Sequence, residues 1–263
     1  MATINKAWVD ASLDQADNER SKISEREREL HGLSSIRLKC LINNLCAAGK
    51  INYLEIGIYK GATLISSVFG NECKAVGVDN FKYDDREPKK WAPEGFIWDN
   101  MKSQLEANID RYKLSPETKV TGSISIIESD FEKVDWTKQP KFNVCLFDIS
   151  PINSTLYDEF FEKTINSLTM ESVVIFTSQS NAQHAEELNS ALLKHQDKFT
   201  IQFSETRLSS GTSDSSKYYS GIRIIGLKKK SMITKKPTVT SNTAPKSNTS
   251  TKAWGKNEKE VCN

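Results

Sequence analysis

The chain has 263 residues, of which 37% are hydrophobic and 27% are charged, and its 36 basic and 34 acidic side chains leave a formal charge of +2. That length and apolar fraction can build one large domain without disulfides or metal. Residues 228–263 hold nine lysines and two glutamates, so the rest of the chain is acidic, which argues against a nucleic-acid-binding protein with a broad basic face.

Signals for export, membrane insertion and zinc binding are missing from the sequence. No apolar run reaches the roughly 18 residues that cross a bilayer, and the N-terminus lacks the apolar stretch of a signal peptide. The five cysteines include no C-x-x-C pair, and no histidine stands beside them as a zinc ligand would. We therefore expect a cytoplasmic protein with reduced cysteines, no membrane insertion and no metal.

Two helices are expected before the main domain, in an N-terminal helical extension over residues 1–50. Residues 10–30 are almost entirely charged or small and polar, with Glu and Arg at helix-compatible spacing, which predicts a solvated helix or an element of a homodimer. Residues 34–48 carry apolar side chains at near-helical spacing before Gly49, which predicts a helix that packs on the following domain.

From residue 51 onward, short β-rich apolar runs alternate with segments of helical length. The expected strands are 52–57, 74–81, 124–129, 142–149 and 172–177, and the expected helices are 62–69, 96–114, 156–168 and 183–196. This alternation predicts βαβ units and a parallel sheet with helices on both faces. Two further strands, 199–208 and 218–227, leave no room for a crossover helix and should form an antiparallel hairpin at the sheet edge.

The predicted fold class is therefore α/β, a Rossmann-like doubly wound sheet of seven mostly parallel strands with N-terminal helices. The main domain spans 51–227. The remaining segment, 228–263, is rich in Lys, Ser, Thr, Asn and Pro, and it cannot bury enough apolar area to offset the entropy of ordering. It is predicted to be a disordered basic tail.

Acidic residues stand at the ends of the first four predicted strands. Glu55 closes the first strand and Asp79 the second, while Asp130 follows the third and Asp148 closes the fourth. In an open α/β sheet the ligand lies beyond the carboxyl ends of the strands. Asp79 also follows Gly57 by 22 residues, a spacing at which an acid can bind both hydroxyls of a ribose. These strand ends predict a site for a nucleotide-type ligand.

The turn after the first strand narrows the choice of ligand. Gly57 permits a backbone conformation that other residues avoid, and Gly61 lets the next helix begin close to a ligand carboxylate or phosphate. A dinucleotide site wants G-x-G-x-x-G, but Tyr59 stands at the middle glycine, and Glu55 would repel a pyrophosphate. S-adenosylmethionine instead offers an ammonium and a sulfonium to the acids, together with a carboxylate, a ribose and an adenine amine.

These residues resemble the class I S-adenosylmethionine-dependent methyltransferases, and the similarity is closest to a small-molecule branch. The first motif of that branch reads Leu-Glu-(Ile/Val)-Gly-x-x-x-Gly-(Ala/Ser)-(Ser/Thr), which Leu54 to Thr63 matches. The resemblance covers roughly residues 51–227. It implies donor-binding roles for Glu55, Gly57, Tyr59 and Gly61 around the methionine moiety, Asp79 at the ribose, Asp130 and Phe131 at the adenine edge, and Asp148 beside the donor near the substrate.

Two segments depart from the family pattern. Relatives often follow the fourth strand with Asp-Gly-x-His, whereas this sequence has Asp148-Ile-Ser-Pro151. After the fifth strand they often carry an acid, sometimes an Asp-Asn metal pair, whereas here residues 177–181 read Thr-Ser-Gln-Ser-Asn. One Asp among amides and hydroxyls is a poor Mg²⁺ site, so no metal is expected. Asp148, and His184 at the start of the following helix, are the candidate catalytic residues.

The function expected from these features is metal-independent methyl transfer from S-adenosylmethionine to an O or N nucleophile of a small molecule. Such an enzyme mainly aligns the acceptor with the methyl group and excludes water. A non-catalytic binding module with a degenerate methyltransferase fold is the alternative from another class, and an NAD-type Rossmann enzyme is a further one. The fold alone does not decide among them.

Overall fold

The structure, a computed structural model, describes residues 4–82, 100–113, 122–149, 155–209, 218 and 220–230. Its α-helices are α1 (Lys6–Asp17), α2 (Glu25–Arg28), α3 (Ile36–Cys46), α4 (Ala62–Val68), α5 (Met101–Lys113), α6 (Leu156–Thr164) and α7 (Ala182–Lys194). Its strands are β1 (Ile51–Ile56), β2 (Cys73–Asp79), β3 (Ser123–Glu128), β4 (Phe142–Phe147), β5 (Leu168–Phe176), β6 (Phe199–Arg207) and β7 (Ile222–Lys229).

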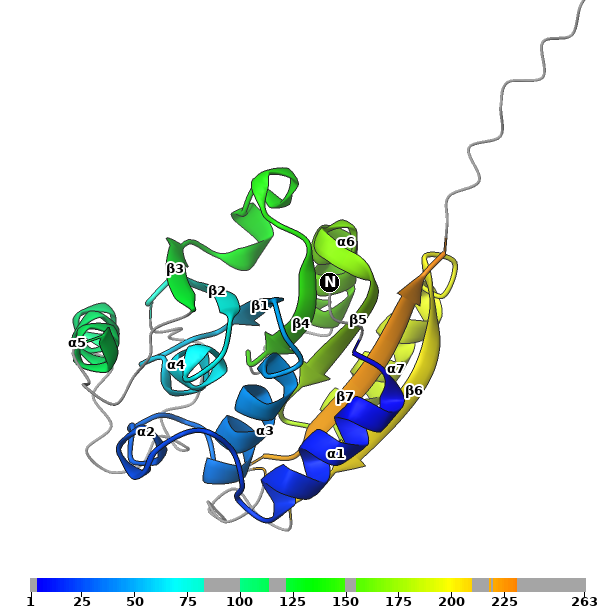
Figure 1. Ribbon diagram of the computed structural model, residues 1–263. Helices are drawn as coiled ribbons and strands as arrows, with labels where there is room; N and C mark the ends of the chain where they lie inside the picture. The colour runs from blue at the N-terminus through cyan, green and yellow to red at the C-terminus, as the bar shows by residue number, and fades with distance from the viewer. Residues whose placement is uncertain are drawn as a thin grey trace, which may run out of the picture. The chain divides into compact units, whose positions relative to one another are not determined.

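The strands form one sheet in the order β3-β2-β1-β4-β5-β7-β6 (Figure 1). β7 runs antiparallel to β5 and β6, and every other neighbouring pair is parallel. The predicted fold class and the terminal hairpin are confirmed, and β7 inserts beside β5 so that β6 forms the edge. The direction of winding changes at β1, because β2 and β3 extend the sheet on one side of it and β4 and β5 on the other. Ligands of open α/β sheets bind at such a point.

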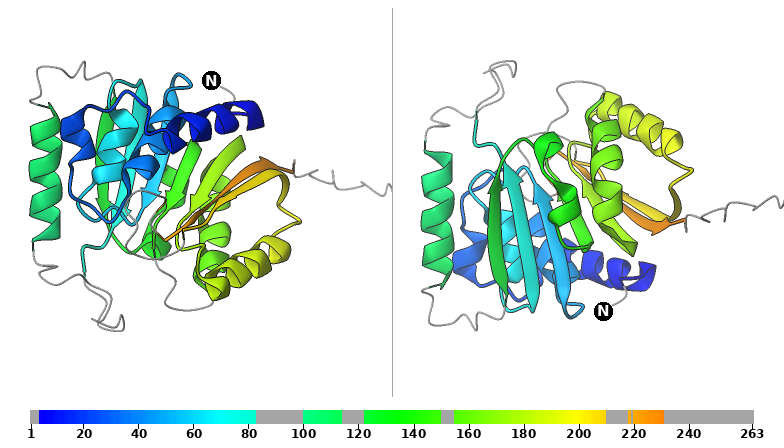
Figure 2. Two further views of the ribbon diagram at one scale, coloured as in Figure 1. Left: turned by 90° about the horizontal axis from the view of Figure 1, so that it is seen from below. Right: turned by 90° about the horizontal axis from the view of Figure 1, so that it is seen from above.

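The two faces of the sheet are covered by different helices (Figure 2). On β1, Tyr53 belongs to an apolar cluster with residues of α1, α3, α4 and α5. Leu54 and Ile56 belong to a second cluster with residues of α6 and α7. Because side chains alternate along a strand, Glu55 shares its face with Tyr53. The carboxyl group of Glu55 is therefore on the face that α3 and α4 cover.

The prediction of one solvated helix over residues 10–30 is wrong. The segment contains two helices, α1 and the short α2, and one side of α1 is buried. Val9, Leu13 and Ala16 form that buried side, at a spacing typical of an amphipathic helix. Asn5 caps α1, since its side chain accepts from the Trp8 amide at 3.0 Å. The many charged neighbours hid this narrow apolar stripe in the sequence.

The boundary between α6 and β5 also differs from the expected one. The expected helix 156–168 ends as an α-helix at Thr164 and continues as a 3-10 turn over Ile165–Ser167. β5 then begins at Leu168, four residues before the expected start of the strand, because Leu168 pairs with Phe142 of β4. Pairing with β4 thus makes Leu168 a strand residue, although the local composition favoured a helix there.

The hairpin extends past the expected beginning of the tail. β7 ends at Lys229, and the amide of Lys230 donates to the Lys198 carbonyl at 2.9 Å. The rest of the predicted tail, 231–263, lies outside the described residues, as does the start of the expected helix 96–114.

Within the part of the chain that the structure describes, we find no helix with the length and apolarity needed to span a membrane.

The packing of α1 can be tested with Leu13→Ala. Because Leu13 is 1% exposed, we expect the free energy of unfolding to fall by about 2–5 kcal/mol. The matched control is Leu193→Ala in α7, where the side chain is 65% exposed, and its effect should stay within about 0.5 kcal/mol. Urea unfolding followed by circular dichroism gives both values. Equally small losses would show that α1 does not pack as described.

Candidate functional site

The turn after β1 packs directly against the end of β4. Gly57 has a φ of +86°, and a Cβ on it would lie 2.4 Å from the carbonyl oxygen of Asp148. The amide of Asp148 in turn donates to the Ile56 carbonyl at 2.9 Å. Gly61 ends the same turn with a φ of +79°. Both the positive φ and the lack of space for a side chain therefore require glycine at position 57. The turn lies next to β1, where the strand order of the sheet reverses.

Asp79 holds this turn from the end of β2. Its Oδ2 accepts hydrogen bonds from the amides of Ile58 at 2.9 Å and Tyr59 at 3.0 Å, and its Oδ1 accepts from the amide of Phe81 at 2.8 Å. Tyr59 takes a left-handed φ of +47° there. A carboxylate oxygen has two lone pairs, so Oδ1 retains room for a hydroxyl donor from a ligand. Asp79 is only half-buried, which leaves it accessible.

Glu55 is fully buried beneath the first turn of α4. Its Oε2 accepts from the Tyr53 hydroxyl at 2.7 Å and its Oε1 from the Thr63 hydroxyl at 2.6 Å. Removal from water raises the pKa of Glu55 to about 8; the two hydroxyl groups lower that pKa, while nearby Asp148 and Asp79 raise it. Glu55 is thus mostly protonated at pH 7 in this structure, shielded from solvent and within electrostatic reach of the acids Asp148 and Asp79.

Asp148, a candidate catalytic and donor-binding residue, is half-buried just after β4. Loss of hydration raises the pKa of its carboxyl to about 6, hydrogen bonding with Thr177 opposes this, and the charge of Asp79 adds to it. Glu55, Asp79 and Asp148 therefore act on one another as like charges. Such a group of acids favours a cationic ligand.

Asp130 and Phe131 lie at the carboxyl end of β3, where the resemblance places the adenine. Asp130 Oδ1 accepts from the Asn80 side chain at 2.7 Å, and the bond from Lys133 to its Oδ2 holds the pKa of this carboxyl below its usual range. The Phe131 ring is buried edge-on against Phe147, with ring centroids 5.7 Å apart. Asn80 follows Asp79 directly, so the two predicted acids are connected through one amide side chain.

The loop after β5 contributes a polar residue that the sequence analysis did not single out. Gln179 is 3% exposed, and its Nε2 donates to the Tyr157 hydroxyl at 3.1 Å and the Thr177 carbonyl at 2.9 Å. The main-chain amide of Gln179 donates to the Gly221 carbonyl at 3.2 Å, which connects this loop to the residue before β7. An amide side chain shortly after an apolar strand was the available signal, but its partners Tyr157 and Gly221 are distant in sequence.

His184 lies in the first turn of α7, the helix that follows the loop after β5. Asn181 caps this helix by accepting from the amides of Gln183 at 2.9 Å and His184 at 3.4 Å. Burial lowers the pKa of the imidazole, with opposing contributions from Glu187 and from the main chain of Ser178. His184 is accordingly neutral at pH 7, as a proton acceptor must be.

The described cysteines and carboxylates form no recognisable metal centre. Cys40, Cys46, Cys73 and Cys145 are buried and free, as predicted, and Cys262 lies outside the described residues. Among the residues with described positions, no cluster of three or more His, Cys, Asp or Glu is arranged to hold a metal ion.

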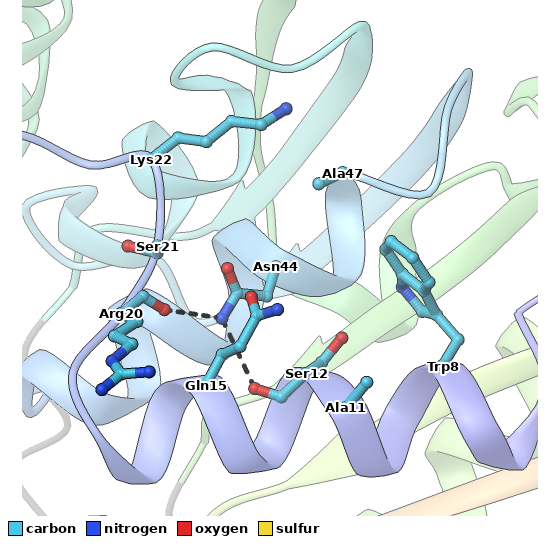
Figure 3. A pocket seen from close by; sticks show the side chains of 9 residues that line it. All are labelled: Trp8, Ala11, Ser12, Gln15, Arg20, Ser21, Lys22, Asn44 and Ala47. Carbon is cyan, nitrogen blue, oxygen red and sulfur yellow. Dashed lines mark hydrogen bonds between the residues drawn. The ribbon is translucent and has the colours of Figure 1, made fainter.

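A separate pocket of about 280 Å³ lies between α1 and α3 (Figure 3). Its lining includes Trp8 and Ser12 of α1, Asn44 of α3, and Lys22. The ammonium of Lys22 donates to the carbonyl of Gly70, just before β2. The pocket thus lies toward the amino ends of the strands and is not continuous with the turn that Asp79 holds.

Comparison with known proteins identifies the fold. No protein-family model and no curated protein matches the sequence. TrmN from Thermus thermophilus is similar in structure, with a TM-score of 0.50 and 14% identity over 78% of this chain and 52% of its own, so this chain spans about half of it. Together with the strand order, this similarity confirms a Rossmann-like class I methyltransferase fold.

Two further solved structures are more distant. An O-methyltransferase from Bacillus cereus in complex with SAH has a TM-score of 0.44 and 14% identity over 86% of this chain and 92% of its own. An rRNA methylase from Streptococcus thermophilus has a TM-score of 0.42 and 10% identity over 69% of this chain and 88% of its own.

The packing of the turn can be tested with Gly57→Ala. We expect a loss of at least about 2 kcal/mol in the free energy of unfolding, because the methyl group adds a clash with the Asp148 backbone to the strain of a positive φ. Gly70→Ala is the control, since Gly70 also has a positive φ but faces only the flexible Lys22 side chain. Similar losses in urea unfolding would contradict the close approach at Gly57.

The buried carboxyl predicts a pH-dependent difference between the wild type and Glu55→Gln. Because the folded pKa of about 8 exceeds the ordinary glutamate value of 4.5, protonation stabilises the fold fully below pH 4.5, and this contribution is lost as pH rises through 8. Gln resembles the neutral acid, so the variant should gain up to about 1.4 kcal/mol per pH unit relative to wild type across that window. Urea unfolding between pH 5 and about 8.5 measures the difference. A constant difference would show that Glu55 has an ordinary pKa.

Proposed function

We propose that this protein is a methyltransferase that binds S-adenosylmethionine beyond the carboxyl ends of β1, β2 and β4. The observation that carries the proposal is the half-buried Asp79, which holds the amides of Ile58 and Tyr59 in a glycine turn where the sheet changes direction. That arrangement leaves an acid facing a ligand beside a turn whose backbone is already in place.

The donor set of this site fits S-adenosylmethionine. Asp79 retains acceptor capacity for ribose hydroxyls, and Asp130 is a partly exposed carboxylate for an adenine amine. Asp148 and Glu55 supply negative charge when ionised, which suits the sulfonium and the ammonium. When bound, S-adenosylmethionine supplies a methyl group that is already activated for displacement. The residues required of the chain are therefore mainly binding and positioning residues.

The chain's own contribution to transfer is alignment, exclusion of water and removal of a proton. Asp148 and His184 are the candidate proton acceptors. Asp148 directly follows β4, and His184 lies in the first turn of α7, after the loop that follows β5. The neutral imidazole of His184 and the Asp148 carboxylate, ionised above pH 6, are both competent to accept a proton at pH 7. Gln179, in the loop after β5 that leads to His184, is held by its hydrogen bonds to Tyr157 and Thr177.

The proposed acceptor is an O or N nucleophile of a small molecule, and the proposed reaction uses no metal. Residues 1–227 carry 27 basic and 32 acidic side chains, a balance that disfavours a polyanionic substrate. A non-catalytic module with the same fold is the alternative, supported by Ile149 and Pro151 at positions where relatives often have Gly and His. An NAD-type enzyme is disfavoured by the buried Glu55 and by Tyr59 in the turn.

Donor binding is tested by calorimetric titration of the full chain with S-adenosylmethionine, S-adenosylhomocysteine and NAD. We expect both adenosyl ligands to bind and Asp79→Ala to weaken them by about 10- to 100-fold, because hydrogen bonds to a charged group are lost. Asp135→Asn is the control, since Asp135 lies on the surface beside Lys138. This variant should bind both adenosyl ligands as tightly as the wild type does. Binding of NAD alone, or of no ligand, would refute the proposal.

Methyl transfer is tested with donor carrying a labelled methyl group. We expect label to appear in a component of a metabolite extract and not in total RNA, with no loss on addition of a chelator. Asp148→Asn and His184→Gln should reduce the rate by about 10²-fold or more if either residue removes the proton. Donor binding without transfer to either pool would favour the non-catalytic module, and transfer to RNA would contradict the acceptor class.

A further inference from the structure

Among the described residues, those around Glu55 are hydroxyl groups and acids, with no compensating cation. Glu55 is 0% exposed, and its two oxygens bond to Tyr53 of the same strand and Thr63 of α4. The other groups that act on it most strongly are Asp79 and Asp148. A buried carboxylate in such surroundings must find a cation or take a proton.

In the part of the chain that the structure describes, the other titratable groups near Glu55 are weak acids. Cys46 at the end of α3 and Cys145 of β4 are fully buried; burial is the main cause that raises the pKa of each thiol, and Glu55 adds to it. The pKa of the Tyr53 hydroxyl is also raised, mainly by burial and further by Glu55. These groups all stay neutral at physiological pH, so none of them supplies positive charge to Glu55.

We propose that Glu55 holds a proton in the ligand-free protein and releases it to solvent when the cationic methyl donor binds. This inference rests on the proposed function and goes beyond it. The cation of the ligand then takes the place of the proton beside the three acids, and the hydroxyl groups of Tyr53 and Thr63 continue to donate to the carboxylate once it is ionised. The carboxyl O–H bond breaks, and the proton passes to the buffer.

The exchange gives the site a preference for the donor over its product. S-adenosylmethionine carries a sulfonium that S-adenosylhomocysteine lacks, so the product provides less positive charge to hold Glu55 ionised. The proton returns to Glu55 when the methyl group has left, and this lowers the affinity for the product. The ratio of donor affinity to product affinity should therefore rise with pH, by up to about tenfold for each unit across the titration of Glu55.

The number of protons released is measured by calorimetric titration of the full chain in buffers of different ionisation enthalpy. At about pH 7.5 we expect roughly 0.5–1 proton released per S-adenosylmethionine and fewer per S-adenosylhomocysteine. Asp148 contributes little at this pH, because its pKa of about 6 leaves it ionised already. Glu55→Gln should release no proton and should lose the pH dependence of the affinity ratio. The exposed Glu128→Gln at the end of β3 is the matched control and should behave as wild type.

A second readout needs no ligand and no kinetic assay. Infrared spectra of the ligand-free wild type at pH 7 should contain the carbonyl band of a buried protonated carboxyl, which disappears at high pH and is missing from Glu55→Gln. If that variant does not fold, the pH titration of the wild-type band and the proton count remain as tests.

The outcomes separate this inference from the proposed function. Donor binding with no net proton release, or with equal release for donor and product, overturns the role of Glu55 and leaves the methyltransferase proposal standing. Failure of both adenosyl ligands to bind overturns both. Proton release that persists in Glu55→Gln assigns it to another group and also overturns the inference.

Discussion

The hydrogen bonds from the turn after β1 to the carboxylate of Asp79 are the interaction on which the candidate site depends. Ile58 and Tyr59 donate from a turn in which Gly57, Tyr59 and Gly61 have left-handed backbone conformations. Asp79, at the end of the neighbouring strand β2, accepts these two hydrogen bonds and so holds the turn in place. Because β1 and β2 are parallel and in register from Ile51 with Cys73 to Ile56 with Val78, this acid arrives beside the turn without any further element. The glycine at position 57 then lets β4 approach, which brings Asp148 to the same place.

That convergence concentrates acids at a place where the described part of the chain brings no cation to Glu55 or Asp148. Asp130 is paired with Lys133, whereas no described cation pairs with Glu55 or Asp148, and burial raises the pKa of both carboxyls. Structural acids normally have lowered pKa values, since paired charges stabilise the fold. An unpaired buried acid lowers stability at neutral pH, and such a cost is characteristic of a functional site. The fold of the chain is that of class I methyltransferases, and the donor of such enzymes is a cation.

Most of the sheet could be predicted from the sequence, because its apolar runs are short, separated and rich in β-branched residues. The helix predicted over residues 34–48 is α3, but α1 and α2 were not separated, since the apolar Val9, Leu13 and Ala16 stand among charged and polar residues and are buried only where α1 packs against α3. The start of β5 was missed for a related reason, because Leu168 becomes a strand residue by pairing with Phe142. Gln179 was overlooked since its partners, Tyr157 and Gly221, come from distant elements.

The sequence by itself determined which acids and glycines end the strands, since strand ends and turns are marked by local composition and by the two-residue period. It also determined that Tyr53 and Glu55 share a face. Only the tertiary structure decided that this face lies under α4, where Thr63 bonds to Glu55, and that Asp79 turns its carboxylate to the backbone of the neighbouring turn. The physical reason is that the burial and the hydrogen-bond partners of a residue depend on which other elements pack against it. Those elements are distant in sequence, so local composition does not identify them.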